Sequence, residues 1–370
     1  MPIRKTSTCL ADGRELICFD GGDGAVRNAV DTRDLGAVAA TSVMRYDVLT
    51  GEWVTFASHR NARTFHPATA DCPLCPSRPG GSATEIPFGD YEVAVFENRF
   101  PAFSFGASGT GDLVDGEQLW PEAPATGRCE VVCFDSDHDR SFADLEPARV
   151  RTVLGALVDR TRELSARPGV AQVYCFENRG EEIGVTLSHP HGQIYAYPTT
   201  TPRTEALLRQ SREYRSRTGG LLLRDVLDAE RRAGARVVAA GEHWTAYVPV
   251  AARWPVEVHV APHRDVADLT ELDDAELDEI AVLWPELLSR FDRYFDGVDR
   301  LPYIAGWHQA PVGEGRELGR LYLQAFSLMR SPHRMKYLAA SESGMGAWIS
   351  DTTPEQIADR LRAVATGPQS

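Results

Sequence analysis

Two histidines and a glutamine alternate in the segment His-Pro-His-Gly-Gln, residues 189–193. β-branched and aromatic residues flank it and no charged residue occurs between residues 184 and 197, which predicts a buried strand. Because side chains alternate along a strand, His189, His191 and Gln193 are predicted to share one face. The proline cannot donate to a sheet, so we expect a sheet edge or a strand end here. A neutral imidazole can attack phosphorus or bind a metal, and an amide can donate to a phosphoryl oxygen.

The same residues also have a purely structural interpretation, in which both histidines are hydrogen-bonded inside a core. That interpretation suits two unrelated histidines, but here an amide continues the alternation and a glycine lies beside it. Glycine lets a ligand or a second backbone come close. Clustered titratable groups are typical of functional sites. We therefore interpret the segment as the place where the chemistry occurs.

Cys72-Pro73-Leu74-Cys75 has the spacing of half a zinc site. No second Cys-x-x-Cys follows, and a redox pair would use the same residues. A tetrahedral zinc needs two further ligands, so the motif alone leaves both interpretations open.

Arg60 and Arg63 lie three residues apart in His59-Arg60-Asn61-Ala62-Arg63. They could form a solvated turn, which is the commoner case for isolated arginines. They could equally clamp a phosphate, because guanidinium groups match phosphate geometry.

A longer pattern surrounds the histidines. Phe176-Glu177-Asn178-Arg179-Gly180, then Gly184, then His-Pro-His-Gly-Gln resembles the galactose-1-phosphate uridylyltransferase family of the histidine-triad superfamily. The hydrolases of that superfamily have a third histidine where this chain has Gln193, and the transferases have glutamine. Gln193 therefore implies a transferase. The resemblance spans residues 45–364.

The resemblance also implies roles for individual residues. His191 would attack the α-phosphorus of UDP-glucose to give a uridylyl-histidine, with Gln193 and Thr186 donating to phosphoryl oxygens. One structural zinc ion would be held by four residues: Cys72, Cys75, His138 and His189. The remaining residues would bind substrate, the last two across the interface of a homodimer: Arg60, Arg63, Phe96, Asn98, Asn178, Gly184, Lys336 and Glu342.

The implied reaction is a ping-pong exchange of UMP between UDP-glucose and galactose 1-phosphate. A related alternative is a phosphorylase, or a transferase for another sugar 1-phosphate, because no amide occurs near residues 349–351 where family members often have a sugar ligand. A third is a nucleotide-binding or zinc-stabilised protein without activity, against which the intact His191 and Gln193 argue.

The second half of the chain repeats the pattern of the first. Residues 256–260 echo residues 130–134, and residues 302–308 echo residues 173–177. Apolar residues at helical spacing predict a helix over residues 144–164 in the first copy and another over 273–295 in the second. We therefore predict an α+β fold of two histidine-triad-like halves with mostly antiparallel sheet. Its divisions are a peripheral segment (1–40), a half with zinc and nucleophile (41–200) and a scaffold half with sugar-phosphate contacts (201–370).

The second copy lacks the histidines of the first. Arg320 and Tyr322 occupy the positions of a second His-x-His, and of three histidines that bind a second metal in some family members only His308 remains. We therefore doubt a second metal.

Composition limits the partners. The chain has 370 residues and a net charge of −14, which argues against nucleic acids and anionic membranes. No apolar run approaches the ~20 residues of a membrane span, and the start carries no apolar signal region. Seven cysteines, an odd number, fit reduced thiols. We expect a cytoplasmic protein.

Overall fold

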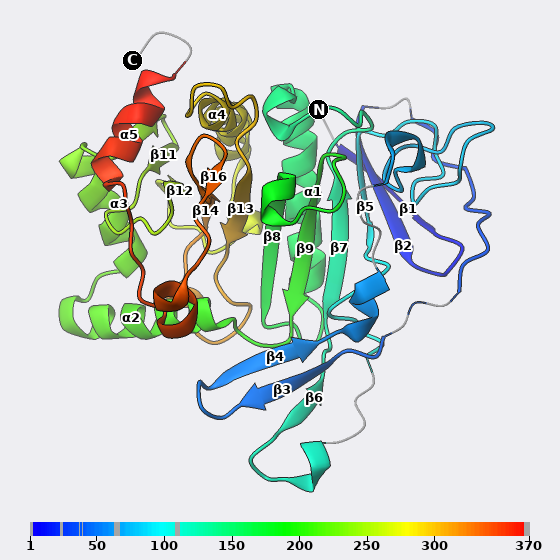
Figure 1. Ribbon diagram of the computed structural model, residues 1–370, viewed down its shortest axis with the longest axis horizontal. Helices are drawn as coiled ribbons and strands as arrows, with labels where there is room; N and C mark the ends of the chain where they lie inside the picture. The colour runs from blue at the N-terminus through cyan, green and yellow to red at the C-terminus, as the bar shows by residue number, and fades with distance from the viewer. Residues whose placement is uncertain are drawn as a thin grey trace.

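A broad antiparallel sheet forms the centre of the protein (Figure 1). The computed structural model describes residues 3–22, 25–36, 38, 40–62, 67–107 and 112–365. Neighbouring strands pair antiparallel throughout this sheet. In spatial order its strands are β1 (Ile3–Cys9), β2 (Glu15–Gly21), β5 (Val93–Glu97), β7 (Arg128–Cys133), β9 (His191–Tyr197), β8 (Gln172–Arg179), β13 (Tyr303–His308), β14 (Tyr322–Ser327), β12 (Val256–Pro262), β11 (Trp244–Tyr247) and β10 (Val237–Ala240).

A smaller sheet projects from one end of the large one (Figure 1). Its order is β4 (Glu52–Phe56), β3 (Val43–Asp47) and β6 (Glu122–Pro124). A two-stranded hairpin, β15 (Met329–Ser331) with β16 (Arg334–Met335), follows β14. The helices are α1 (Pro147–Ser165), α2 (Pro202–Thr218), α3 (Leu222–Ala233), α4 (Asp274–Asp292) and α5 (Pro354–Ala363).

The two halves repeat one arrangement of a strand, a helix and two strands. In the first half β7, α1, β8 and β9 follow one another, and the strands lie in the order β7-β9-β8. In the second half β12, α4, β13 and β14 follow one another, and the strands lie in the order β12-β14-β13. The halves meet where β8 pairs with β13, with Glu177 opposite Ala305. The prediction of an antiparallel α+β fold with an internal duplication is confirmed.

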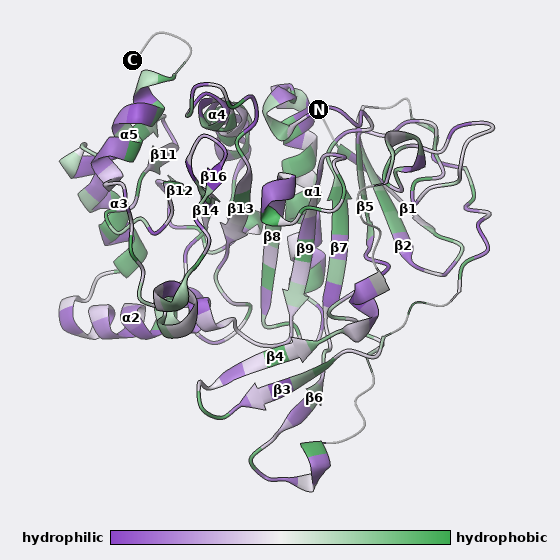
Figure 2. Cartoon of the chain, in the orientation of Figure 1, coloured by the Kyte–Doolittle hydropathy of each residue, from purple (hydrophilic) through white to green (hydrophobic). Residues whose placement is uncertain are grey.

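The main core lies between the sheet and the helices α1 and α4. Leu154 of α1 and Ile280 of α4 are at most 2% exposed and belong to one cluster with alternate residues of the strands, such as Val132 and Ile194. Figure 2 shows β7 as largely hydrophobic and α2 as largely hydrophilic, which matches a buried central strand and a surface helix. The predicted helices over 144–164 and 273–295 correspond to α1 and α4.

One predicted strand is shorter than expected. We expected a strand from residue 185, but β9 begins at His191, and a 3-10 turn and a loop precede it. The turn ends at Gly184 with a φ of 83°, a left-handed conformation that glycine adopts without strain. Pro190 cannot donate a sheet hydrogen bond, so the strand starts after it. The proline therefore marks a strand end, and it precedes a central strand rather than an edge strand.

The first residues of the chain join the large sheet. β1 and β2 pair with each other, and β2 continues onto β5. Among the described residues, no helix is long and apolar enough to cross a membrane.

Candidate active site

His191 is the first residue of β9, the strand between β7 and β8. Its Nδ1 lies 2.8 Å from the carbonyl oxygen of His189. The carbonyl can only accept, so Nδ1 carries the proton and Nε2 keeps its lone pair. Burial lowers the pKa of His191, which keeps the ring neutral near pH 7. The geometry therefore presents a neutral imidazole with Nε2 available as a nucleophile.

A cavity of about 320 Å³ lies beside this ring. It brings together six of the predicted site residues: Arg60, Phe96, Asn98, Thr186, His191 and Gln193. The register of the sheet explains part of this grouping, because Phe96 of β5 pairs with Val131 of β7, which in turn pairs with Gln193 of β9. Gln193 contacts Tyr195, whose hydroxyl donates to its Oε1 at 3.3 Å. The amide nitrogen of Gln193 is the part of this side chain that can donate to a ligand.

The loop after β5 forms another wall of the cavity. The Asn98 side chain accepts a hydrogen bond from the backbone N–H of Phe100 at 2.8 Å, and Arg60 donates to the Phe100 carbonyl at 2.8 Å. These bonds fix the loop beside the cavity. Arg63, the second predicted arginine, lies outside the described residues.

A second cavity, of about 220 Å³, is also lined by His191. Asn178 lines it, together with Arg179 and Arg300. Gly184 ends the 3-10 turn two residues before Thr186. It is not among the described residues that line either cavity.

Lys336 and Glu342 lie together in the C-terminal segment. Their charged groups are 3.6 Å apart, and Lys336 also donates to the carbonyl of Ile349. Neither is among the described residues that line the two cavities beside His191. Within one chain, the structure therefore pairs them with each other rather than placing them beside His191.

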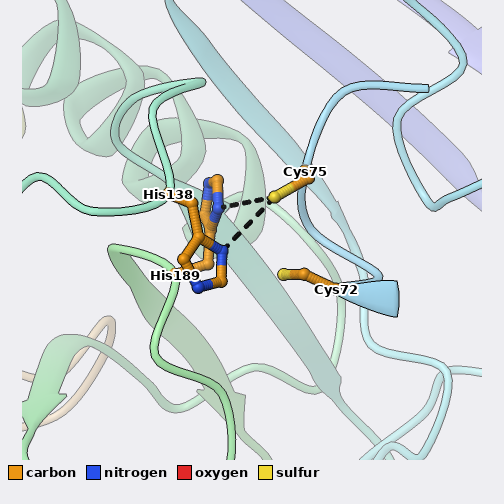
Figure 3. Close-up of side chains that lie close together, drawn as sticks. All are labelled: Cys72, Cys75, His138 and His189. Carbon is orange, nitrogen blue, oxygen red and sulfur yellow. Dashed lines mark hydrogen bonds between the residues drawn. The ribbon is translucent and has the colours of Figure 1, made fainter. Parts of the chain in front are cut away.

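The four predicted metal ligands lie close together around His189, the first residue of the His-Pro-His-Gly-Gln segment (Figure 3). The Sγ atoms of Cys72 and Cys75 and one ring nitrogen each of His138 and His189 all lie within 4.8 Å of one another. The Nδ1 of His138 is 3.3 Å from the Cys75 Sγ, and that of His189 is 3.5 Å from it. Tetrahedral zinc with bonds of about 2.0–2.3 Å requires ligand atoms at roughly these separations. The four side chains therefore fit a metal ion.

The chemistry of the donors also favours a cation. Burial and the neighbouring Cys72 raise the pKa of the Cys75 thiol to about 12, so a cation is needed to hold the sulfur as thiolate. Burial lowers the pKa of His189 to about 3, which leaves the ring neutral. Its Nε2 lies 2.9 Å from the Asp135 carbonyl and 2.7 Å from the Tyr91 hydroxyl. These contacts leave Nδ1 free to bind metal.

No sequence signal pointed to Tyr91, because an aromatic residue next to a strand resembles any core residue. The sequence also did not point to Arg33 and Glu85, which line the larger cavity. Arg33 lies in a run of charged residues, Asp31-Thr32-Arg33-Asp34, and an arginine in a loop is usually solvated.

In the second half, Tyr322 at the start of β14 corresponds to His191 at the start of β9, and His308 of β13 is its partner in the sheet. His308 Nε2 lies 3.0 Å from the Oε1 of Gln324, whose amide donates to Glu257 at 2.6 Å. The Tyr322 ring stacks on His308, with 4.5 Å between centroids. The absence of a second metal stays a prediction from the sequence.

Comparisons with known proteins agree with the geometry. Residues 34–201 match the model of the galactose-1-phosphate uridyl transferase N-terminal domain, and residues 207–367 match that of the C-terminal domain. The chain belongs to the galactose-1-phosphate uridylyltransferase family. Its resemblance to that family, first suggested by the motif, is confirmed.

Individual members of this uridylyltransferase family match most of the chain. A galactose-1-phosphate uridylyltransferase of Streptomyces lividans is 47% identical over 98% of both chains. One of Thermotoga maritima is 32% identical over 86% of this chain and 97% of its own. A solved uridylyltransferase structure superposes with a TM-score of 0.76 at 31% identity, covering 87% of this chain and 98% of that one. An Arabidopsis thaliana ADP-glucose phosphorylase, at 22% identity and a TM-score of 0.66, shares the fold. None of these findings supports the phosphorylase alternative.

Proposed function

We propose that this protein exchanges UMP between UDP-glucose and galactose 1-phosphate through a covalent intermediate on His191. The observation that carries the proposal is the His191 Nδ1 contact with the His189 carbonyl, at 2.8 Å, beside a cavity that also contains Gln193 and Thr186. Membership of a uridylyltransferase family supports the same chemistry.

In the first step, the Nε2 lone pair attacks the α-phosphorus. The P–N bond forms, the bond from the α-phosphorus to the bridging oxygen breaks, and glucose 1-phosphate leaves with that electron pair. The imidazole becomes positively charged as it is uridylylated, and the His189 carbonyl stabilises that charge through Nδ1–H. In the second step, a phosphate oxygen of galactose 1-phosphate attacks the same phosphorus and the P–N bond breaks. The histidine returns to its neutral form.

Gln193 and Thr186 would donate hydrogen bonds to the non-bridging phosphoryl oxygens. Both donors are neutral, so they favour the crowded transition state without holding the charged nucleotide tightly as a product. Arg60, from the same cavity, would provide positive charge for the phosphates. Phe96 and Asn98 would contact the uridine.

The metal that suits two thiolates and two imidazoles is zinc, whose tetrahedral sites commonly use these ligands. Four protein ligands leave no open position, so zinc would be structural. It would tie the Cys72–Cys75 loop and the loop of His138 to the start of β9. The residues of the chain itself perform every step of the transfer.

Three further parts of the proposal rest on the family resemblance. The protein would be a homodimer in which Lys336 and Glu342 contact the hexose phosphate bound to the partner subunit. Galactose 1-phosphate would be the preferred acceptor. The enzyme would act in the cytoplasm.

The test begins with UDP-glucose labelled at the α-phosphate. After unbound nucleotide is removed, the protein should retain label, and galactose 1-phosphate should discharge it as labelled UDP-galactose. Other sugar 1-phosphates offered in parallel define the acceptor preference. A protein that retains no label, yet produces UDP-galactose when both substrates are present, would contradict the covalent mechanism.

A further inference from the structure

The N-terminal segment contributes to the cavity that contains the nucleophile. Arg33 and Leu35 line the cavity together with Phe96, His191 and Gln193. The match to the family's N-terminal domain begins at residue 34, so Arg33 lies just before the matched part of the chain. Its position in the wall of the cavity calls for a role in binding.

Arg33 is joined to the β5 side of the cavity, because it donates to Glu85, and Arg14 donates both to Glu85 and to the Glu97 carbonyl of β5. The cavity crosses three neighbouring strands, from Gln193 on β9, over Val131 on β7, to Phe96 on β5. Two strand spacings amount to roughly 10 Å, a length that a ribose and a base fill when the α-phosphate lies at His191. Beyond Phe96, Arg14 donates to the carbonyl of Glu97 at 2.9 Å and holds the wall against β5. The base of a bound nucleotide therefore points toward this wall.

The wall presents a fixed pair of charges, Arg33 and Glu85. The Nη1 of Arg33 is 3.2 Å from Oε1 of Glu85, and its Nη2 donates to Oε2 at 3.2 Å. Asp31 accepts two further hydrogen bonds from the Arg33 guanidinium, one from Nε at 2.8 Å and one from Nη2 at 2.7 Å. On the far side of Glu85, Arg14 donates to Oε2 at 2.6 Å.

These contacts hold the pair in one orientation before any ligand arrives. Glu85 is only 6% exposed and Arg14 only 3%, so neither carboxylate nor guanidinium can turn away into solvent. Arg14 and Asp31 are thus positioning residues for the pair. A donor and an acceptor held side by side can match a donor–acceptor pattern on a ligand with little loss of entropy on binding.

We propose that Arg33 and Glu85 select the base of the nucleotide, accepting uracil and rejecting cytosine. This inference rests on the proposed nucleotide-transfer function. Uracil presents an N3–H donor beside a carbonyl oxygen, which complements a carboxylate beside a guanidinium. Cytosine presents a lone pair at N3 and an amino group in place of that oxygen. Its lone pair would face the carboxylate and its amino group would face the guanidinium, and such mismatched buried groups are strongly rejected.

Two variants test the pair, and a third serves as a control. Glu85→Gln keeps the shape of the side chain but adds an N–H donor that the cytosine N3 can accept. Arg33→Met removes the guanidinium, while Asp31 keeps its backbone N–H donors from Ala11 and residue 33. Arg27→Met removes another arginine of the N-terminal segment, one that binds Asp20 and is not among the described residues lining the cavity.

The measurement is the dissociation constant of UMP and of CMP by titration calorimetry on the full-length, metal-loaded protein. Wild type and Arg27→Met should prefer UMP. Glu85→Gln and Arg33→Met should each reduce that preference by about 10- to 100-fold, the effect of losing a hydrogen bond to a charged group. Thermal unfolding of each variant verifies that it is folded.

The inference is overturned if both folded variants keep the wild-type ratio, or if the wild type binds UMP and CMP equally. Retention of label from UDP-glucose is measured on the same samples. If wild type takes up label but the ratio of the UMP and CMP dissociation constants is the same in both variants as in wild type, only base selection is contradicted. The transfer function is then still supported. Wild type that takes up no label contradicts both.

Discussion

At the scale of single residues, the two histidines of the motif differ in which ring nitrogen is free. In His191, Nδ1 donates to a backbone carbonyl and Nε2 remains available. In His189, Nε2 contacts the Asp135 carbonyl and Nδ1 faces the sulfur of Cys75. A backbone carbonyl thus fixes each tautomer. This difference allows one ring to act as a nucleophile and the other to bind metal, although they lie only two residues apart.

Cys72→Ser should remove the metal and lower stability together, because a hydroxyl is a poor zinc ligand and the loss of the ion unties the two ligand-bearing loops from the buried His189. We expect the zinc content to fall from about one per chain to nearly none and the free energy of unfolding to fall by at least about 2 kcal/mol. Elemental analysis and urea unfolding measure the two effects. Cys9→Ser, at an exposed cysteine, is the control and should change neither. Full zinc content in Cys72→Ser would exclude this residue as a ligand.

At the scale of elements, periodicity predicted the long helices well. Leu154 and Ile280 lie on apolar stripes, and both are buried against the sheet in α1 and α4. The start of β9 was predicted less well, because the uncharged run before Pro190 has strand composition but no sheet partner. Residues 185–187 are only half-buried and Ser188 is exposed, because whether a run of strand composition joins a sheet depends on neighbours that are remote in sequence. Arg33 and Glu85 were missed for the same reason, since 52 residues separate them.

His308, the last residue of β13, should make the stability of the protein depend on pH. Burial, and then the charge of Arg203, lower the pKa of His308 to about 3. The unfolded state, with a pKa near 6.5, therefore binds more protons between those values. Stability contributed by neutral His308 should be complete above about pH 6.5 and should decline as the pH falls toward 3.

His308→Gln should flatten this dependence by about 1–3 kcal/mol between pH 7 and pH 4, allowing for the partial exposure of the ring. Glutamine can still donate to Gln324, so the hydrogen bond at this position is kept. Urea unfolding at several pH values measures the difference. His333→Gln, at a histidine of the β15–β16 turn whose surroundings are exposed, is the control and should follow the wild-type curve. An unchanged slope in His308→Gln would contradict the assignment.

At the scale of the whole molecule, the duplication gives one sheet whose two halves carry different residues at corresponding positions. The first half has the proposed nucleophile, His191, at the start of β9, and the second half has Arg320 and Tyr322 at the corresponding start of β14. Arg320 donates to the backbone carbonyls of Pro262, His263 and Arg264. A guanidinium thereby cross-links the loop that follows β12 at the position where the first half uses His189. The sequence revealed this asymmetry because the duplication aligns the two motifs.

Hybrid dimers test whether two chains build one site. A His191→Gly protein and a Lys336→Ala protein should each be nearly inactive. After mixing and subunit exchange, some activity should return, because one site of each hybrid has both residues intact. Exchange is verified by mass spectrometry of differently tagged subunits. No recovery after verified exchange would indicate that each chain completes its own site.

The central claim is that His191 and no other residue carries the uridylyl group, and locating the label tests it most directly. The protein is incubated with UDP-glucose, quenched under alkaline conditions that preserve the P–N bond, digested, and mapped by mass spectrometry. We predict a uridylyl group on His191 in wild type and none in His191→Gly, with zinc content and unfolding midpoint nearly unchanged in that variant. A uridylyl group on His189, or on any residue other than His191, would contradict the mechanism.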